Sequence, residues 1–165
     1  MNPGEAMALR PVATGELRDV LRRITDRGDE ILGVDPRRRN LAAMTKRLAD
    51  MGARLFEVLL GDVPVAVVAH THNPLNRDQA TVGVAAFEPE HAASAVWTHV
   101  TQLAERFGTG SFVSTAAVGS AAVAVYRAAG FREVGRMRMH LYREHAYHDA
   151  SVLHLSLRPG SGVPG

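Results

Sequence analysis

The sequence predicts one α/β domain, in which a mixed β-sheet of about seven strands carries helices on both faces. The chain has 165 residues, of which 46% are apolar, and this is the size of a single domain with a single core. Apolar residues recur every three or four positions in four segments, as in amphipathic helices, and form seven shorter runs typical of strands. Three successive strands are followed by alternating helices and strands, an order that combines antiparallel and parallel pairing.

The chain begins with a strand and two helices. Residues 7–12 form a short apolar strand. A helix follows from the expected N-cap Thr14 to Gly28, and a second helix follows Pro36 and ends at Gly52. Their apolar residues lie at helical spacing: Leu17, Val20, Leu21 and Ile24 in the first, and Leu41, Met44, Leu48 and Met51 in the second.

Three strands occupy the middle of the chain. Residues 54–60 and 63–72 are expected to form a hairpin, because two apolar runs flank a Gly-Asp turn. A polar turn over residues 73–78 leads to a third strand over residues 79–87. Pro89 follows this strand closely and marks the connection to the next helix.

The C-terminal part alternates helices with strands. Residues 91–107 have the most regular helical pattern of the chain. Residues 120–129 form a helix rich in Ala and Val, and Gly130 is its expected C′ residue. Three strands complete the sheet, at residues 112–116, 131–142 and 151–157.

Composition excludes several classes of protein. The chain has no cysteine, so disulfides, thiolate nucleophiles and sulfur-ligated zinc are ruled out. No apolar run approaches membrane-spanning length, and the N-terminus lacks the basic and apolar regions of a signal peptide, so a cytoplasmic location without membrane partners is expected. We expect residues 1–158 to form the domain and residues 159–165 to be a flexible tail rich in Pro and Gly.

Charge argues against a nucleic-acid partner. The chain has nineteen Lys and Arg residues and seventeen Asp and Glu residues, so its net charge is only +2. A nucleic-acid surface needs clustered basic residues interleaved with aromatic ones, and aromatic residues are 5% of this chain.

Residues 122–136, AVAVYRAAGFREVGR, resemble the most recognisable stretch of the GNAT (Gcn5-related) acyltransferases. In that family a helix carrying A-x-x-x-Y precedes a Gly-Phe turn and an E-x-G-R strand. Residues 87–91, FEPEH, and the hairpin over residues 139–149 are similar to the branch that acetylates ribosomal proteins and small amines. The resemblance covers roughly residues 7–158 and implies a GNAT-like mixed sheet that is partly splayed.

The resemblance implies an acyl-CoA co-substrate, acetyl-CoA or another acyl-CoA. Two diverging parallel strands leave backbone groups that an extended pantetheine arm pairs with, and the first amides of a helix bind the pyrophosphate. Phe87 ends the first of these strands, and its backbone amide is expected to polarise the acyl carbonyl. The helix residues expected at the coenzyme are Ala92, Ala93, Ser94, Ala95, Val96, Trp97 and Thr98.

The phosphate loop departs from the family pattern, Q/R-x-x-G-x-G/A. Ala92 stands in the first position, Ala95 in that of the first glycine and Trp97 in that of the last small residue, while Gly119 replaces an Asn that is usual before the tyrosine-bearing helix. In one interpretation the helix amides still bind the anion, because alanine costs little in helical backbone. In the other, Trp97 fills the phosphate pocket and the chain is a degenerate relative; a lone Trp on a helix is also commonly a core residue.

Tyr126 stands where GNAT enzymes often place the tyrosine that protonates the departing thiolate, although a packing role is the alternative. An amine also needs a base to take its proton. Glu88, at the end of the central strand, is the first candidate for this base, and Glu57, His70 and His72 are further candidates.

Other chemistries are poorly supported by the motifs. His145, His148 and Asp149 lack the spacing of a metal site, the family uses no metal, and we predict a solvated turn there. No G-x-S-x-G is present, and Gly108-Thr-Gly110 does not complete a dinucleotide fingerprint.

The leading hypothesis is an N-acyltransferase that moves an acyl group from acyl-CoA to a small-molecule or protein amine. The alternatives are a binding module without transfer activity, and an enzyme that uses a carrier-protein acyl donor or different chemistry in the same cleft. The resemblance implies that residues 28–40 and 143–149 select the acceptor. Four acidic residues in or near the first of these segments either attract a cationic amine or simply solvate the loop: Asp26, Asp29, Glu30 and Asp35. Edge strands make a homodimer a further expectation.

Overall fold

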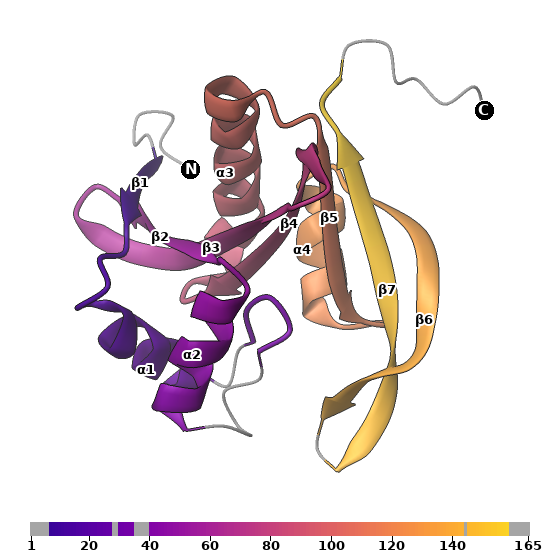
Figure 1. Cartoon of the computed structure of the whole chain (residues 1–165), viewed down its shortest axis with the longest axis horizontal. Coiled ribbons are helices and arrows are strands. Elements are labelled where there is room, and N and C mark those ends of the chain that lie inside the picture. Colours follow the sequence, from indigo (N-terminus) through magenta and orange to yellow (C-terminus); the bar gives the residue numbers. More distant parts are fainter. Residues whose placement is uncertain (1–6, 28–29, 35–39, 144, 159–165) are drawn as a thin grey trace.

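The computed structural model describes residues 7–27, 30–34, 40–143 and 145–158 (Figure 1). Its strands are β1 (Met7–Pro11), β2 (Arg54–Leu60), β3 (Val63–Asn73), β4 (Asn76–Ala86), β5 (Ser111–Ala117), β6 (Arg132–Arg143) and β7 (Ala146–Ser156). Its helices are α1 (Leu17–Arg27), α2 (Leu41–Asp50), α3 (Ala92–Phe107) and α4 (Ala121–Ala128), with a 3₁₀ turn over Pro89–His91. The predicted class is confirmed: the seven strands form one sheet in the order β1-β2-β3-β4-β5-β7-β6.

Every neighbouring pair of strands is antiparallel except β4 and β5, which lie at the centre and run parallel. Their pairing extends only from Gln79 opposite Ser111 to Thr81 opposite Val113. The rest of β4 and the rest of β5 diverge. The sheet is therefore split at its middle, toward the C-terminal ends of both strands.

The face covered by α1 and α2 has its own apolar core (Figure 1). Asn40 caps α2, because its side-chain oxygen accepts a hydrogen bond from the Ala43 amide at 2.8 Å. Helix α1 begins at Leu17, so the prediction of Thr14 as its N-cap is wrong. Residues 14–16 form a turn in which Glu16 accepts a hydrogen bond from the Ala13 amide at 3.0 Å, and this turn delays the helix. The buried members of this core are Val20, Leu21, Ile24, Ile31, Val34, Met44, Leu48, Leu55, Val67, Ala69, Ala85 and Phe87.

The other face is covered by α3 and α4 (Figure 1). Phe112 of β5 is fully buried there between the helices and the β7 strand. Val96, Val100 and Leu103 of α3 pack against the same cluster, while Ala95 of α3 packs against β3. Helix α3 thus contacts both halves of the split sheet.

Two turns are shorter than predicted. The polar turn expected over residues 73–78 is confined to residues 74–75, because β4 already begins at Asn76. β7 begins at Ala146, and its extended hairpin with β6 includes an edge-on contact between Tyr142 and Tyr147, with ring centroids 4.8 Å apart. Polar residues occupy these strand ends because both faces are exposed there, so the alternation that marks a half-buried strand is lost.

Some predictions fall outside the described residues. They are the helix end at Gly28, the tail over residues 159–165 and parts of both segments expected to select the acceptor. Within the described part of the chain, no helix combines the length and apolar character needed to cross a membrane.

Candidate active site

The split between β4 and β5 exposes one edge of β4. The Phe87 amide donates a hydrogen bond to the Val65 carbonyl of β3 at 2.9 Å, whereas the Val82 carbonyl accepts one from the Ser114 hydroxyl of β5 at 3.0 Å. Backbone groups alternate in direction along a strand, so odd-numbered residues of this stretch face β3 and even-numbered residues face the split. The N–H and C=O groups of Val84 and Ala86 therefore point toward the split, beyond the last paired residue Thr81.

A cleft of about 270 Å³ occupies this split. Residues of both diverging strands, of the start of α4 and of the segment before α2 line the cleft. The cleft therefore reaches both helical layers. Its lining residues are Glu30, Leu32, Gly33, Thr81, Val82, Gly83, Val84, Ser114, Thr115, Ser120, Ala121, Ala122 and Tyr126.

Tyr126 of α4 forms the floor of the cleft. Its side chain is 3% exposed, and its ring contacts Phe131 edge-on with centroids 5.3 Å apart. Its hydroxyl lies 3.5 Å from the Val82 carbonyl. Burial, reinforced by the charge of Glu30, raises the pKa of Tyr126 to about 12 although hydrogen bonds to Ser114 and the Val84 backbone oppose this. The phenol therefore keeps its proton at neutral pH.

A tight turn carries Glu30 to the opposite side of the cleft. Ile31 and Val34 exchange backbone hydrogen bonds, and the two residues between them have positive φ angles, 50° at Leu32 and 72° at Gly33. The turn lies directly on Gly83 of β4: a Cβ atom there would be 2.9 Å from the Leu32 nitrogen. Glycine at this position thus allows the turn to border the cleft.

The other three predicted acidic residues are not part of the described cleft lining. Asp26 lines a separate pocket with Phe87, and Asp29 and Asp35 lie outside the described residues. Of the predicted acidic residues that the structure describes, Glu30 is the one that borders the cleft.

The start of α4 supplies a second polar group. Ser120 is the N-cap of α4 and lines the cleft, yet its buried hydroxyl has no hydrogen-bond partner in the described structure. Gly119 before it has φ of 73°, a conformation that both Gly and Asn tolerate. An orphaned hydroxyl beside an unpaired strand edge suits a polar ligand that pairs with backbone.

Helix α3 begins directly after the 3₁₀ turn that follows β4. Ala92 and Ala95 are buried, with 1% and 0% exposure, and none of residues 92–98 has a positive φ angle. The conformational freedom of glycine is therefore not needed here. The Ala92 amide is bonded to the Pro89 carbonyl, which leaves the amides of Ala93 and Ser94 as the first-turn donors without a helical partner.

The predicted coenzyme residues of α3 do not belong to the described lining of the cleft. Val96 is buried in the core, whereas Ser94 and Trp97 are exposed and Thr98 is half-buried. The Trp97 side chain is 46% exposed, so the interpretation of Trp97 as a core residue is wrong. Its position in the second turn of α3 directs it away from the packed face that carries Val96 and Val100.

The role predicted for Phe87 is wrong. Its amide donates to Val65 and its carbonyl accepts a hydrogen bond from the Arg27 side chain, so neither group faces the split. Its ring lies against the Arg23 and Arg27 guanidinium groups, 5.4 and 5.8 Å from the ring centroid. The amide that faces the cleft belongs to Val84, three residues earlier, and the sequence alone does not indicate which edge of β4 is unpaired.

The predicted bases occupy other surroundings. Glu88 is absent from the described cleft lining, and its Oε2 atom lies 3.4 Å from His91 Nε2. Glu57 is buried and paired with both Arg10 and Arg23. Burial favours a higher pKa for Glu57, but its hydrogen bonds to Arg23 and Arg10 outweigh burial and hold the pKa below its usual value. Glu57 therefore serves the ion-pair network at this corner of the sheet.

Within the described part of the chain, His145, His148 and Asp149 are not gathered into a group of potential metal ligands. Asp149 accepts a hydrogen bond from the Met139 amide at 3.0 Å, and His154 lies 2.9 Å from the Ser111 hydroxyl. Among the described residues, one group brings three potential ligand atoms within 4.8 Å of one another: Glu88, Glu90 and His91.

The chain has the fold of the GNAT acetyltransferases. No protein-family model and no curated protein matches the sequence. Among solved structures it resembles the Salmonella typhimurium acetyltransferase that modifies the N-terminal serine of ribosomal protein L7/L12, with 17% identity over 92% of this chain and 95% of that chain and a TM-score of 0.73. It also resembles the Vibrio cholerae spermidine N-acetyltransferase solved with CoA and spermine, with 17% identity over 91% and 95% and a TM-score of 0.74.

Proposed function

We propose that this chain is an N-acyltransferase that moves an acetyl or other short acyl group from acyl-CoA to an amine. The observation that carries the proposal is the split between β4 and β5, where the backbone groups of Val84 and Ala86 face away from β3 and the Val84 backbone bonds the Tyr126 hydroxyl. An extended pantetheine arm carries amide groups that suit this edge, and it would enter as an added strand. The orphaned Ser120 hydroxyl offers a further hydrogen bond.

The cleft suits direct transfer without a covalent enzyme intermediate. The amine nitrogen attacks the thioester carbon, and the Val84 amide stabilises the negative charge on the former carbonyl oxygen. The C–S bond then breaks, and the thiolate takes the proton of the Tyr126 hydroxyl. Burial raises the pKa of Tyr126 to about 12, so the phenol is protonated when the thiolate departs and is available to donate to the sulfur.

The proton of the attacking amine leaves through the opposite side of the cleft. Glu30 borders that side and acts electrostatically on Tyr126, so it is better situated than Glu88 to accept a proton through water. The same carboxylate attracts a cationic amine before it is deprotonated. The proton finally returns to the tyrosinate, and the sum is acyl-CoA plus amine giving amide plus CoA.

The coenzyme phosphates would bind where α3 begins. The amides of Ala93 and Ser94 have no helical partner, and the positive end of the helix dipole favours an anion there. His91, the N-cap, makes no side-chain cap hydrogen bond that would compete. Residues Ala92–Thr98 thus remain our proposed phosphate region, with Ala93 and Ser94 as its donors.

The acceptor is proposed as an amine of a small molecule or of a protein terminus. The spermidine and L7/L12 acetyltransferases that share the fold act on these two kinds of amine. A homodimer and a cytoplasmic location stay predictions.

Titration calorimetry with acetyl-CoA tests the proposal, and saturable binding is expected. Tyr126→Phe should reduce kcat at least about tenfold while leaving coenzyme affinity unchanged, because the variant loses a proton donor and keeps the ring. Arg18→Gln, a change on exposed α1, serves as the control. Absence of binding at millimolar acetyl-CoA would contradict the proposal, and unchanged turnover of the Phe variant would remove Tyr126 from the reaction.

One alternative has a specific observation in its favour. The departures at Ala95 and Trp97 lie in the phosphate region, and a buried alanine prevents the close backbone approach that glycine permits. A module that binds its partner without acyl transfer would share the cleft but not the coenzyme. The same calorimetric experiment separates the two functions.

A further inference from the structure

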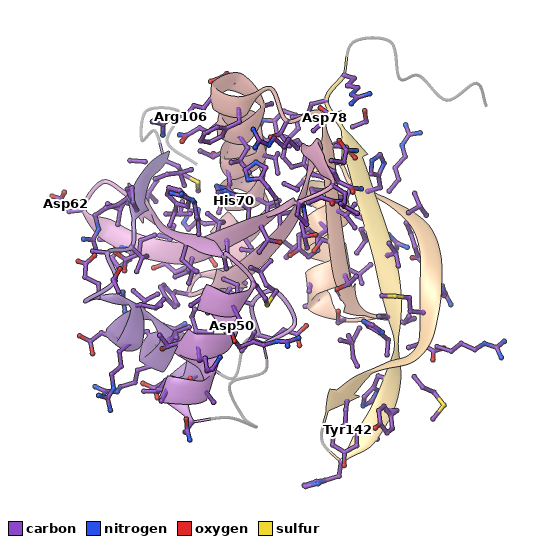
Figure 2. The ribbon with its side chains drawn as sticks, viewed as in Figure 1. Asp50, Asp62, His70, Asp78, Arg106 and Tyr142 are labelled. Carbon is purple, nitrogen blue, oxygen red and sulfur yellow. The ribbon has the colours of Figure 1, made fainter. Side chains whose placement is uncertain are left out.

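A second pocket lies at the end of the sheet opposite the split, beside the C-terminal end of α3. Its volume is about 480 Å³, and its lining residues are Arg54, His70, His72, Arg77 and Phe107. They come from the start of β2, the end of β3, the start of β4 and the last residue of α3. Figure 2 shows His70 on the α3 side of the sheet, with Arg106 at the far end of the helix. We call this pocket the histidine pocket.

Two arginines, Arg54 and Arg77, carry the positive charge of the histidine pocket. Arg54 and Arg77 are exposed, and none of the described acidic side chains forms an ion pair with either of them. Asp78, the acid adjacent to Arg77, is paired with Arg158 and accepts a hydrogen bond from the Gly110 amide at 3.0 Å. Two guanidinium groups that lack carboxylate partners therefore border one cavity.

One residue that lines the histidine pocket, His70, belongs to a buried histidine pair. His70 Nδ1 lies 3.1 Å from His99 Nε2 of α3, and the two residues are 1% and 2% exposed. The other ring nitrogens, His70 Nε2 and His99 Nδ1, are buried and have no hydrogen-bond partner in the described structure. Buried polar atoms are nearly always paired, so an orphaned nitrogen on a pocket-lining side chain indicates a missing ligand or water.

The pair permits a tautomer that suits an acceptor in the pocket. If His99 donates through Nε2, then His70 accepts at Nδ1 and carries its own proton on Nε2. That N–H would be the donor that His70 offers to the pocket. His72 adds a second imidazole: its ring lies edge-on to His70 with centroids 5.0 Å apart, and its Nε2 lies 3.4 Å from the Thr109 hydroxyl.

One wall of the pocket is apolar. Phe107 is 63% exposed, and its ring contacts His72 edge-on with centroids 5.8 Å apart. An exposed aromatic side chain beside a cationic cavity accommodates a ligand that joins a negative group to an apolar one.

We propose that the histidine pocket is a binding site for a small organic anion, in which a phosphate or carboxylate group contacts Arg54, Arg77 and His70 while an apolar portion packs on Phe107. The site is distinct from the cleft at the split. Paired guanidinium groups bind a phosphate through charge-assisted hydrogen bonds, so a phosphate monoester is expected to bind more tightly than a carboxylate of the same shape. The proposal does not rest on the proposed acyltransferase function.

Phenyl phosphate is the test probe, with benzoate and inorganic phosphate for comparison. Calorimetry should show saturable binding of phenyl phosphate to the full chain, and Arg54→Gln combined with Arg77→Gln should weaken it about tenfold or more. Arg18→Gln removes the same type of charge on α1 and should leave the affinity unchanged. Phe107→Ala should weaken the binding of phenyl phosphate more than the binding of inorganic phosphate.

Nitrogen-15 spectra of the histidine side chains provide the second measurement. Phenyl phosphate should shift and sharpen the His70 signals toward one tautomer, and the double arginine variant should abolish the effect. No binding to the unmodified chain at millimolar probe, or equal binding by the double variant, would overturn the proposal. Acetyl-CoA affinity should be the same in the double variant, so failure of this site is distinguishable from failure of the transferase function.

Discussion

Glu57 is a single buried carboxylate that joins three elements of the structure. It lies on β2 with 2% exposure and pairs with Arg10 of β1 and Arg23 of α1. Arg10 also bonds Glu16, which ends the turn before α1, at 2.8 Å. This network fixes the angle between the edge strand and the first helix. It also explains why Glu57 is buried although it is not the catalytic base.

Glu57→Gln should therefore destabilise the fold by roughly 2 kcal/mol at neutral pH, because it replaces charge-assisted hydrogen bonds with neutral ones. The native pKa of Glu57 lies below the unfolded value of about 4.3, so its stabilisation is present above that pH and is lost as pH falls through the native pKa. Urea unfolding of both proteins at pH 7 and pH 3 measures the difference, which should shrink in acid. Lys46→Gln, in an exposed pair with Asp50, should change stability by less than about 0.5 kcal/mol.

His99 makes the stability of the fold sensitive to acid at a higher pH than Glu57 does. Burial, with a smaller contribution from His70, lowers the pKa of His99 to about 3, and burial lowers the pKa of His70 to about 4 with help from His72 and Arg54. The unfolded chain binds a proton at each histidine near pH 6.5, so stability falls as pH drops below that value.

For His99 alone the loss at pH 5 relative to pH 8 should be roughly 2 kcal/mol, and His99→Gln should show a correspondingly flatter dependence. His148→Gln, on the exposed part of β7, should retain the slope of the unmodified chain. Thermal unfolding across this pH range measures both. An equal slope in His99→Gln would mean that the buried pair is not the source.

At the scale of elements, the turn between α1 and α2 depends on one glycine of β4. A Cβ at position 83 would lie 2.9 Å from the Leu32 nitrogen and 3.2 Å from Ile31 Cγ1, and the first of these is backbone that cannot rotate away. Gly83→Ala should therefore cost about 1–3 kcal/mol and displace Glu30 from the cleft. On the proposed function, the acceptor KM should rise more than the coenzyme Kd changes.

Gly15→Ala is the matched control, because nothing lies within 4 Å of a Cβ at that position. Steady-state kinetics and calorimetry on both variants provide the comparison. If Gly83→Ala keeps the acceptor KM of the parent, the turn does not contribute to amine binding.

The elements themselves were predictable because periodicity is local. The pattern of Val96, Val100 and Leu103 predicts α3, and no distant residue is needed to interpret it. The start of α1 was misplaced because a turn held by Arg10 and Glu16, six residues apart, competes with the Thr14 cap. The site was only partly predictable: Tyr126 follows from a motif, whereas Ser114, Ser120 and Glu30 meet only through pairing between β4 and β5 and through the turn on Gly83.

At the scale of the whole molecule, the sheet consists of two halves. Strands β1 to β4 form one half, and β5, β7 and β6 form the other. The direct strand pairing between them covers three residues of β4, Gln79 to Thr81, and α3 packs on both halves. A ligand that pairs with both edges of the split would therefore add hydrogen bonds where the pairing between strands is shortest.

Hydrogen exchange at β4 tests this arrangement. The amides of Val84 and Ala86 face the split, whereas the Ala85 amide faces β3 and is already paired there. In the free protein, Ala86 should exchange faster than Ala85. Saturating acetyl-CoA should slow exchange at Ala86 about tenfold or more, with smaller changes at Val84 and Ala85, because the added strand supplies the acceptor that Ala86 lacks, whereas Val84 is bonded to Tyr126 and Ala85 to β3. Residue-resolved exchange by NMR, on samples whose saturation is established by calorimetry, makes the measurement. Coenzyme that binds while all three amides keep their rates would have to bind outside the split, and the assignment of the cleft to acyl-CoA would then be abandoned.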